Sequence, residues 1–319
     1  MAARRTPRIP AVIAHRGASA HRPEHTLGSY ELAYGLGADS VELDVVATRD
    51  GVLVCLHDVE LSSTTDVADH KAYADRRRTL EVEGETLTGW FVHDFDLFEL
   101  RELRTRERWP RKRAGSASFD GRWPVPTVAE VIELRDFEAA RSGRRLGMHL
   151  ELKSPQHLRM HGLWLPELIA ETGVDVATDL TFMSFDDETI RAVDSPRRYR
   201  LFDKSPTPRE LGRVAEYADG IGVRRKAVLP KDVAGRVGDP SRLVDKAHRR
   251  GLEVLVWTHR PENQHLPSNL RIGSAPHGHG DSAGEAAMLY AAGIDGLITD
   301  VPEVALIGRN RLPGLPVAH

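Results

Sequence analysis

Residues 41–57 of the chain read VELDVVATRDGVLVCLH, and this stretch holds two apolar segments separated by a tight turn. The segments 41–46 and 52–57 are rich in β-branched side chains, which favour strands. The residues between them, Arg49-Asp50-Gly51, are too few for a crossover between parallel strands, which needs a dozen or more residues. We therefore expect a hairpin in which only residues 41–46 belong to a parallel sheet.

Outward from this hairpin, short apolar runs alternate with amphipathic segments. We expect strands at 12–15, 41–46, 146–152, 180–185, 199–202, 220–223, 254–258 and 296–299. We expect helices at 26–36, 127–141, 163–171, 186–193, 208–217, 240–250 and 282–292. Eight strands that alternate with helices predict an α/β fold, a TIM (β/α)8 barrel.

The segment 59–125 interrupts this alternation. It is rich in aromatic residues, which disordered linkers lack, so we interpret it as an ordered insertion at the barrel mouth. Within it we expect a helix over 96–108, and we expect the arginines from Arg101 to Arg113 to form a solvated face. The predicted organisation is a single barrel domain over 9–308, the inserted segment, and a proline-containing tail over 309–319.

Composition excludes several classes of protein. The chain has 319 residues with 44 basic and 47 acidic side chains, a net charge of −3, which argues against nucleic-acid binding over the whole surface. The single Cys55 excludes an intramolecular disulfide, and its apolar neighbours predict a buried thiol. No apolar run approaches 18 residues, so we expect no membrane-spanning helix. The oligomeric state stays open.

The start of the chain bears on localisation. Residues 1–10 contain no apolar stretch, so we expect no secretory signal in this sequence. A cytoplasmic location is expected for the chain as written, and export is expected if a signal has been removed.

Polar side chains stand at the carboxyl ends of several predicted strands, which is where a TIM barrel carries its chemistry. Glu42 and Asp44 are two residues apart, so they project from the same face of one strand. Glu151 and Lys153 repeat this spacing on another strand. Three carboxylates at one mouth repel one another unless a cation lies between them, and oxygen ligands favour Ca²⁺ or Mg²⁺.

Two histidines adjoin this predicted cluster. His15 and His57 follow strands, and imidazoles titrate near neutrality, so the pair could act as general base and general acid on a phosphodiester. Arg16 and Lys153 could neutralise phosphoryl oxygens.

These residues lie in motifs that occur in order along the chain. The motifs are HRGAS at 15–19, PEHT at 23–26, ELDV at 42–45, TRDG at 48–51, HD at 57–58, ELK at 151–153, SFD at 184–186, VWT at 256–258 and ITD at 298–300. Together they resemble the glycerophosphodiester phosphodiesterase family. The segment with GWF at 89–91 and FDGR at 119–122 is similar to that of its longer, periplasmic-type members.

The resemblance implies a TIM-barrel enzyme that hydrolyses glycerophosphodiesters to sn-glycerol 3-phosphate and an alcohol. It implies one divalent metal, Ca²⁺ or Mg²⁺, bound by Glu42, Asp44 and Glu151. It implies that His15 and His57 are the acid–base pair, and that Arg16 and Lys153 hold the phosphate of a small-molecule substrate.

The resemblance also implies roles for residues around the expected metal and the two histidines. Trp257 would form a wall of the glycerol pocket, and Glu24 would orient the metal or the glycerol side. His25 stands where the family motif has asparagine, which leaves the supporting role of this position open.

Three other functions are compatible with the sequence. The first is a lysophospholipid phosphodiesterase of the phospholipase D and sphingomyelinase type, which shares the barrel and the paired acids. The second is a catalytically silent homologue that binds a phosphate-bearing ligand. The third is a nucleic-acid binder that uses the Arg101–Arg113 cluster.

Overall fold

The structure, a computed structural model, describes residues 9–173 and 180–313. Its centre is a ring of eight parallel strands, closed because β1 pairs with both β11 and β2. The strands of the ring are β1 (Ala11–His15), β2 (Ser40–Ala47), β6 (Gly147–Leu152), β7 (Leu180–Ser184), β8 (Arg198–Phe202), β9 (Gly220–Arg224), β10 (Glu253–His259) and β11 (Gly296–Thr299). The predicted TIM barrel is confirmed.

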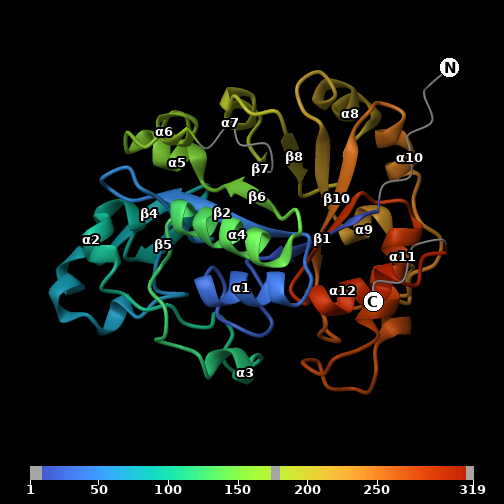
Figure 1. The fold of residues 1–319 in the computed structure, drawn as a ribbon, viewed down its shortest axis with the longest axis horizontal. Coiled ribbons are helices and arrows are strands. Elements are labelled where there is room, and N and C mark those ends of the chain that lie inside the picture. The colour runs from blue at the N-terminus through green and yellow to red at the C-terminus, as the bar shows by residue number, and fades with distance from the viewer. Residues whose placement is uncertain (1–8, 174–179, 314–319) are drawn as a thin grey trace.

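Helices surround the ring, as Figure 1 shows for α1, α4 and α12 on the side nearest the viewer. They are α1 (Leu27–Gly35), α4 (Val128–Ser142), α5 (Pro155–Met160), α6 (Leu165–Thr172), α7 (Asp187–Ala192), α8 (Pro208–Val214), α9 (Arg225–Val228), α10 (Leu243–His248), α11 (Ser282–Ala291) and α12 (Pro302–Arg309). Among the described residues, none of the helices is long and apolar enough to cross a membrane.

The hairpin predicted from residues 41–57 is present. Strand β3 (Leu53–Cys55) runs antiparallel to β2, with Val45 opposite Cys55 and Ala47 opposite Leu53. Strand β3 therefore lies outside the parallel ring. Cys55 is a free, buried thiol, as its apolar surroundings predict.

The barrel interior follows the two-residue alternation of the strands. Inward-facing apolar side chains form a core cluster separate from the one between strands and helices. Its members are Ile13, Met183, Tyr199, Leu201, Leu255 and Ile298. One step further toward the carboxyl end of β1, the inward position is His15, two residues after Ile13. The apolar cluster thus forms the floor below the polar strand ends.

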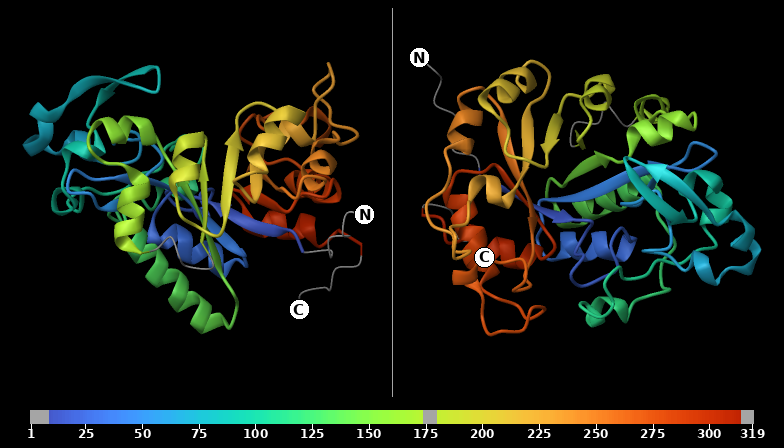
Figure 2. Two further views of the ribbon diagram at one scale, coloured as in Figure 1. Left: turned by 90° about the horizontal axis from the view of Figure 1, so that it is seen from above. Right: turned by 180° about the vertical axis from the view of Figure 1, so that it is seen from behind.

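The segment 59–125 forms a lobe at one side of the barrel, seen in teal in Figure 1 and from two further directions in Figure 2. Its elements are η1 (Val67–Asp69), η2 (Lys71–Arg76), β4 (Arg78–Val82), β5 (Glu85–Gly89), η3 (Val92–Asp94), α2 (Leu97–Leu100) and α3 (Ala114–Ala117). Four buried aromatic side chains anchor it to the main core: Tyr73, Trp90, Phe91 and Phe95.

The helix predicted over 96–108 is wrong in length. Asp96 caps its start, with a backbone N–H that donates to the Glu99 carboxylate at 3.1 Å, but α2 covers only Leu97–Leu100. The following residues bond elsewhere, since the Arg104 N–H donates to the Asp66 carboxylate at 2.8 Å and the Thr105 N–H donates to the Trp123 carbonyl. These contacts across the lobe outweigh the local helical preference.

The expected solvated arginine face is also wrong for two of its members. Arg108 and Arg113 point inward, and the Arg113 side chain is buried. Their ion pairs belong to the cavity described below.

Two further differences concern helices. The predicted helix over 240–250 begins later, at Leu243. Helix α12, which starts at Pro302 and packs on β1 and α11, was not among the predicted helices. The predicted tail over 309–319 lies partly outside the described residues, which end at 313.

Candidate active site

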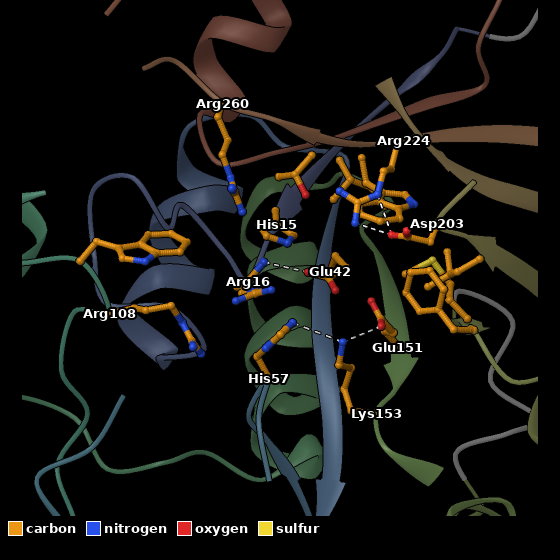
Figure 3. Close-up of a pocket in the computed structure, with 17 residues that line it drawn as sticks. His15, Arg16, Glu42, His57, Arg108, Glu151, Lys153, Asp203, Arg224 and Arg260 are labelled. Atoms are coloured by element: carbon orange, nitrogen blue, oxygen red, sulfur yellow. Dashed lines mark hydrogen bonds and ion pairs between the residues drawn. The ribbon is translucent and has the colours of Figure 1, made fainter. Parts of the chain in front are cut away.

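A cavity of about 370 Å³ opens at the carboxyl ends of the barrel strands. Its floor is apolar, with Ile298 and Leu201, and its walls are polar. Figure 3 shows Arg260 reaching down toward His15 and Arg16, while Arg224 and Asp203 lie on the other side of Glu42. The cavity therefore combines a buried apolar base with charged groups aimed at one volume.

Three carboxylates form a group beside this cavity. Each of Glu42, Asp44 and Glu151 offers an oxygen within 4.8 Å of the others. Burial and the like charges of Asp44 and Glu151 raise the pKa of Glu42 well above its usual range. Oδ1 of Asp44 is buried and accepts no hydrogen bond. A buried oxygen that accepts no hydrogen bond is energetically costly. The three carboxylates therefore offer oxygen ligands of the kind that a hard cation needs, one of them without a competing partner.

His15 stands at the end of β1 and is oriented by a carboxylate. Its Nδ1 lies 2.7 Å from Oδ1 of Asp300, which follows β11. An ionised carboxylate only accepts, so Nδ1 carries the proton and Nε2 is the acceptor nitrogen. Burial and the neighbouring Arg16 charge lower the pKa of His15 to about 4. The imidazole is therefore neutral at pH 7 in the ligand-free cavity.

His57 has the same arrangement on the opposite side. Its Nδ1 lies 2.6 Å from Oδ1 of Asp58, and Nζ of Lys153 donates to its Nε2 at 3.3 Å. Burial, with the charge of Arg16, lowers the pKa of His57 to about 4. Both histidines thus hold a proton on Nδ1 and a lone pair on Nε2.

Lys153 joins His57 to the carboxylate group. Its Nζ lies 2.8 Å from Oε1 of Glu151 and 3.9 Å from Oδ1 of Asp44. Burial alone would lower the pKa of Lys153, but the two carboxylates hold it above its usual value. Lys153 is thus a fixed cation at the cavity wall.

Arg16 is held by a left-handed turn. Its φ is 58° and that of Gly17 is 82°, and a Cβ at Gly17 would meet Oγ of Ser29 at 2.4 Å. The Arg16 backbone N–H donates to Oε2 of Glu42 at 2.9 Å, and its guanidinium donates to Glu24 at 3.0 Å. Only glycine fits the second position, so the HRG sequence fixes the guanidinium in place.

Glu24 lies between two arginines rather than among the grouped carboxylates. Its Oε1 accepts from Arg16 and, at 2.8 Å, from Nη2 of Arg108. Burial alone would raise the pKa of Glu24, but the two guanidinium groups hold it well below its usual range. Glu24 therefore positions cations at the cavity.

His25 orients Asp44. Its Nε2 lies 3.0 Å from Oδ2 of Asp44 and its Nδ1 lies 2.7 Å from the Tyr30 hydroxyl. The backbone of His25 has φ of 55°, a region in which asparagine and histidine are both enriched. The histidine therefore suits both the backbone conformation and a contact to the carboxylate group.

The arginine-rich lobe contributes to the cavity. Arg108 and Trp109 line it, and Nη1 of Arg108 donates to Oδ2 of Asp58 at 2.6 Å. Arg113 pairs with Glu262 at 3.0 Å and with Asp300. The lobe thus reaches the carboxylates that orient both His57 and His15.

Aromatic side chains form the opposite wall. Trp257, on β10, meets the Phe185 ring edge-to-face with 5.5 Å between centroids. The guanidinium of Arg224 lies 4.8 Å from the Trp257 ring centroid and pairs with Asp203. This wall can hold an apolar carbon skeleton beside a charged group.

The structure brings the predicted site residues together. Seven of them line one cavity: His15, Arg16, Glu42, His57, Glu151, Lys153 and Trp257. Asp44 and Glu24 are buried immediately behind it.

Several residues at the cavity were not predicted as site residues, although Asp58, Phe185 and Asp300 lie in the motifs quoted above. They are Asp58, Arg108, Trp109, Arg113, Phe185, Asp203, Arg224, Arg260 and Asp300. Phe185, Asp203 and Arg224 continue the inward alternation at the ends of β7, β8 and β9, so that pattern could have found them. Arg108 and Trp109 lie in an irregular loop and give no such signal.

The chain matches a known family over most of its length. The profile described as the glycerophosphoryl diester phosphodiesterase family matches residues 15–304. A glycerophosphodiester phosphodiesterase of Arabidopsis thaliana is 32% identical over 328 residues, covering 91% of this chain and 83% of that protein. One from Haemophilus influenzae is 27% identical over 345 residues, covering 92% of this chain and 88% of that protein.

A solved structure has the same fold. It is a phosphodiesterase of Oleispira antarctica in complex with the product sn-glycerol-3-phosphate. The TM-score is 0.64 with 22% sequence identity, and the match covers 95% of this chain and 97% of that one.

Proposed function

The chain belongs to the glycerophosphoryl diester phosphodiesterase family and is an enzyme of that class, and we propose that its cavity hydrolyses glycerophosphodiesters to sn-glycerol 3-phosphate and an alcohol. The observation that carries the proposal is the pair of carboxylate-oriented histidines beside three grouped carboxylates. The Oleispira antarctica phosphodiesterase, which shares the fold, was solved with that glycerol phosphate as its product.

Glu42, Asp44 and Glu151 would hold one divalent cation, Ca²⁺ or Mg²⁺. Their oxygens lie within 4.8 Å of one another, and Oδ1 of Asp44 has no hydrogen-bond donor. Carboxylate oxygens suit hard cations better than zinc or copper. When bound, such a cation polarises a phosphoryl oxygen and stabilises the negative charge of the transition state.

His15 and His57 would carry the proton transfers. Because each Nδ1 is bonded to a carboxylate, Nε2 is the nitrogen of each ring that would exchange a proton with the substrate. On His57 this nitrogen accepts from Nζ of Lys153, so substrate binding must displace that contact. A neutral imidazole accepts the proton of the attacking hydroxyl, which belongs to water or to the glycerol C2 position. Attack by the C2 hydroxyl would expel the alcohol and leave a cyclic phosphate, which water would then open to sn-glycerol 3-phosphate. An anionic substrate offsets the positive charge of Arg16 and so favours protonation of the second histidine, which donates to the leaving alcohol.

The cations of the wall would bind the phosphate. Arg16 and Lys153 are buried or nearly so and are held in place by Glu24 and Glu151. Arg108 and Arg260 line the same cavity from the lobe and from the residue after β10. Because these side chains are already fixed, they lose little entropy on binding and can stabilise charge that develops at phosphorus. Trp257 would contact the glycerol carbons.

Release of sn-glycerol 3-phosphate from glycerophosphocholine tests this function. The protein is assayed with Mg²⁺, with Ca²⁺ and with excess chelator, and the panel also contains the ethanolamine, glycerol and inositol diesters and a lysophospholipid. We expect turnover of glycerophosphodiesters with one of the two metals and none with chelator. Turnover of the lysophospholipid alone would instead indicate the phospholipase D type, and no turnover of any diester would indicate a silent homologue. Activity that chelator leaves intact would overturn the metal requirement.

A further inference from the structure

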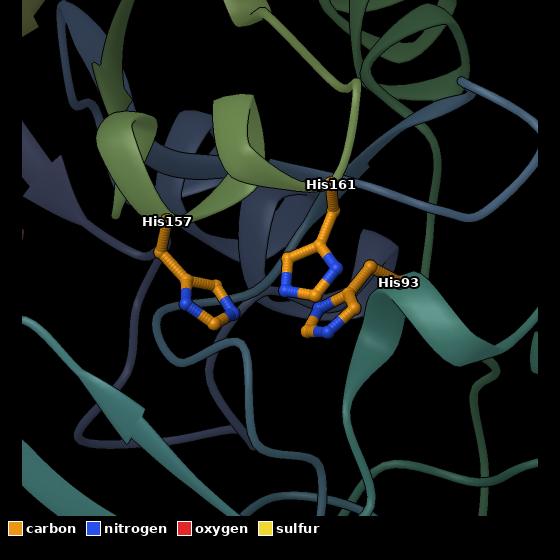
Figure 4. A group of neighbouring side chains, drawn as sticks. All are labelled: His93, His157 and His161. Atoms are coloured by element: carbon orange, nitrogen blue, oxygen red, sulfur yellow. The ribbon is translucent and has the colours of Figure 1, made fainter.

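Three histidines meet on the outside of the barrel, away from the catalytic cavity. His93 lies in η3 of the lobe, and His157 and His161 lie four residues apart at α5. Their ring centroids are 4.0 Å apart for His93 and His161, 4.8 Å for His157 and His161, and 5.0 Å for His93 and His157. Figure 4 shows the three rings facing one another between the lobe and α5.

The two inner rings have nitrogens that no protein group satisfies. His93 is 5% exposed and His157 is 3% exposed. Nδ1 of His93 and both ring nitrogens of His157 are buried without a hydrogen-bond partner. Buried polar atoms almost always have a hydrogen-bond partner or a ligand. The unpaired nitrogens of His93 and His157 therefore indicate a ligand from outside the protein.

The rings are also in the form that binds metals. Burial, with the neighbouring His161 and His157, lowers the pKa of His93 to about 3, and burial likewise lowers the pKa of His157. Neutral imidazole is the form that binds metals. At pH 7 neither His93 nor His157 therefore carries an extra proton that it must lose before coordination.

We propose that His93, His157 and His161 form a second cation site, specific for a nitrogen-preferring divalent metal such as Zn²⁺. Their ligand atoms lie within 4.8 Å of one another. Zn–N bonds of about 2.0–2.1 Å place tetrahedral ligand nitrogens about 3.3 Å apart, so the rings must close by about 1.5 Å at most. His161 is exposed at the end of α5 and can make that movement, and water completes the tetrahedron.

Ligand chemistry separates this site from the carboxylate group. Imidazole nitrogens suit Zn²⁺, whereas Ca²⁺ and Mg²⁺ require oxygen ligands. The two sites should therefore be filled by different ions in one protein. This proposal does not depend on the catalytic function proposed above.

Arg78 competes with a metal for His93. Its Nη2 donates to Nε2 of His93 at 3.2 Å and pairs with Oδ1 of Asp94 at 2.7 Å. Coordination through the unpartnered Nδ1 of His93 moves the ring proton to Nε2, which then repels the guanidinium. Arg78 must release His93 while keeping its pair with Asp94, so Arg78 weakens zinc binding in the native protein.

The site would tie the lobe to the barrel. Helix α5 begins two residues after Lys153, and η3 belongs to the lobe that supplies Arg108 to the cavity. A metal bridging η3 and α5 would therefore restrain the lobe against the segment that follows Lys153.

Zinc binding to the full-length, metal-free protein tests the proposal, by competition with a chromophoric chelator in excess Mg²⁺. His161→Ala is the first variant because that side chain is exposed and its loss leaves the core intact. His157→Ala is the second, and His277→Ala, an exposed histidine in a distant loop, is the matched control. We expect the native protein and the control to bind one more zinc per chain than either ligand variant.

Cobalt substitution gives an independent readout. Co²⁺ bound to the native protein should show the visible absorption of a nitrogen-ligated tetrahedral ion, and His161→Ala should lose it. Arg78→Ala should bind zinc more tightly than the native protein. Equal zinc stoichiometry and affinity in the native protein and His161→Ala would overturn the proposal.

Discussion

Nδ1 of His15 lies 2.7 Å from Oδ1 of Asp300, although 285 residues separate the two. The contact exists because β1 and β11 are neighbours in the closed ring, so the ends of the first and last strands meet. His57 receives the same kind of contact from its chain neighbour Asp58. Two routes, one through barrel closure and one local, thus produce the same histidine orientation.

Asp300→Asn should lower kcat/KM by about 10²-fold with little change in KM. Asparagine can still accept from Nδ1 of His15, but it removes the charge that favours a protonated ring. Steady-state kinetics against pH check this. Asp295→Asn, which removes a carboxylate from His248 at the other end of β11, is the control and should keep kcat/KM. Equal kinetics in Asp300→Asn and the native protein would contradict the role of Asp300.

Arg108→Gln should lower kcat/KM by about 10- to 100-fold, since it removes a cavity cation and one ion-pair partner from each of Glu24 and Asp58. Arg106→Gln is the matched control, because Arg106 is two residues away and pairs only at the surface with Asp69. Kinetics of the two variants on the same substrate measure the difference. An equal loss in both would mean that Arg108 acts through the stability of the lobe.

Glu42→Gln should abolish the stabilisation that a divalent cation gives. At a metal concentration 100 times Kd, the native protein should gain about 2.7 kcal/mol in free energy of unfolding. In the absence of metal the variant should be at least as stable as the native protein, since it removes one of three repelling carboxylates. Thermal unfolding with and without Mg²⁺ or Ca²⁺ measures both effects, and equal metal-induced shifts would refute the carboxylate site.

His265 should make the protein less stable in acid. Burial and the charge of Arg260 lower its pKa to about 4 in the folded protein, against about 6.5 when unfolded. As the pH falls below 6.5 the unfolded chain takes up this proton first, so stability present above pH 6.5 is lost toward pH 4. Between pH 7 and pH 5, His265→Gln should lose about 1–2 kcal/mol less than the native protein in urea unfolding. Parallel losses would contradict the lowered pKa.

The strands were predictable from the sequence by two patterns. Strands β2, β7 and β11 are buried at every position, which favours apolar runs, whereas β6 and β8 alternate between buried and partly exposed residues. The eight strands of the ring match the eight predicted ranges within one or two residues. The hairpin β4–β5 was not predicted. Its turn places Glu83 and Gly84 at positive φ, and glutamate there lacks the Asn-Gly or Asp-Gly signal of such turns.

The site was predictable where it follows strand ends and not where it depends on the lobe. Glu42 and Asp44 share a face because of strand geometry alone. Arg108 is different, because its run of arginines has the composition of a solvated surface. Only the packing of the lobe selects Arg108 and Arg113 for burial beside Asp58 and Asp300. The His93, His157 and His161 group likewise joins segments far apart in the chain.

Turnover of glycerophosphocholine by His15→Ala and His57→Ala tests the central claim, two-histidine catalysis, most directly. With each protein saturated with Mg²⁺ or Ca²⁺ and shown to be folded, each substitution should lower kcat by about 10²- to 10⁴-fold, the range of a lost general acid or base. His277→Ala, at an exposed loop, should keep native turnover. Near-native turnover by both His15→Ala and His57→Ala would contradict the claim.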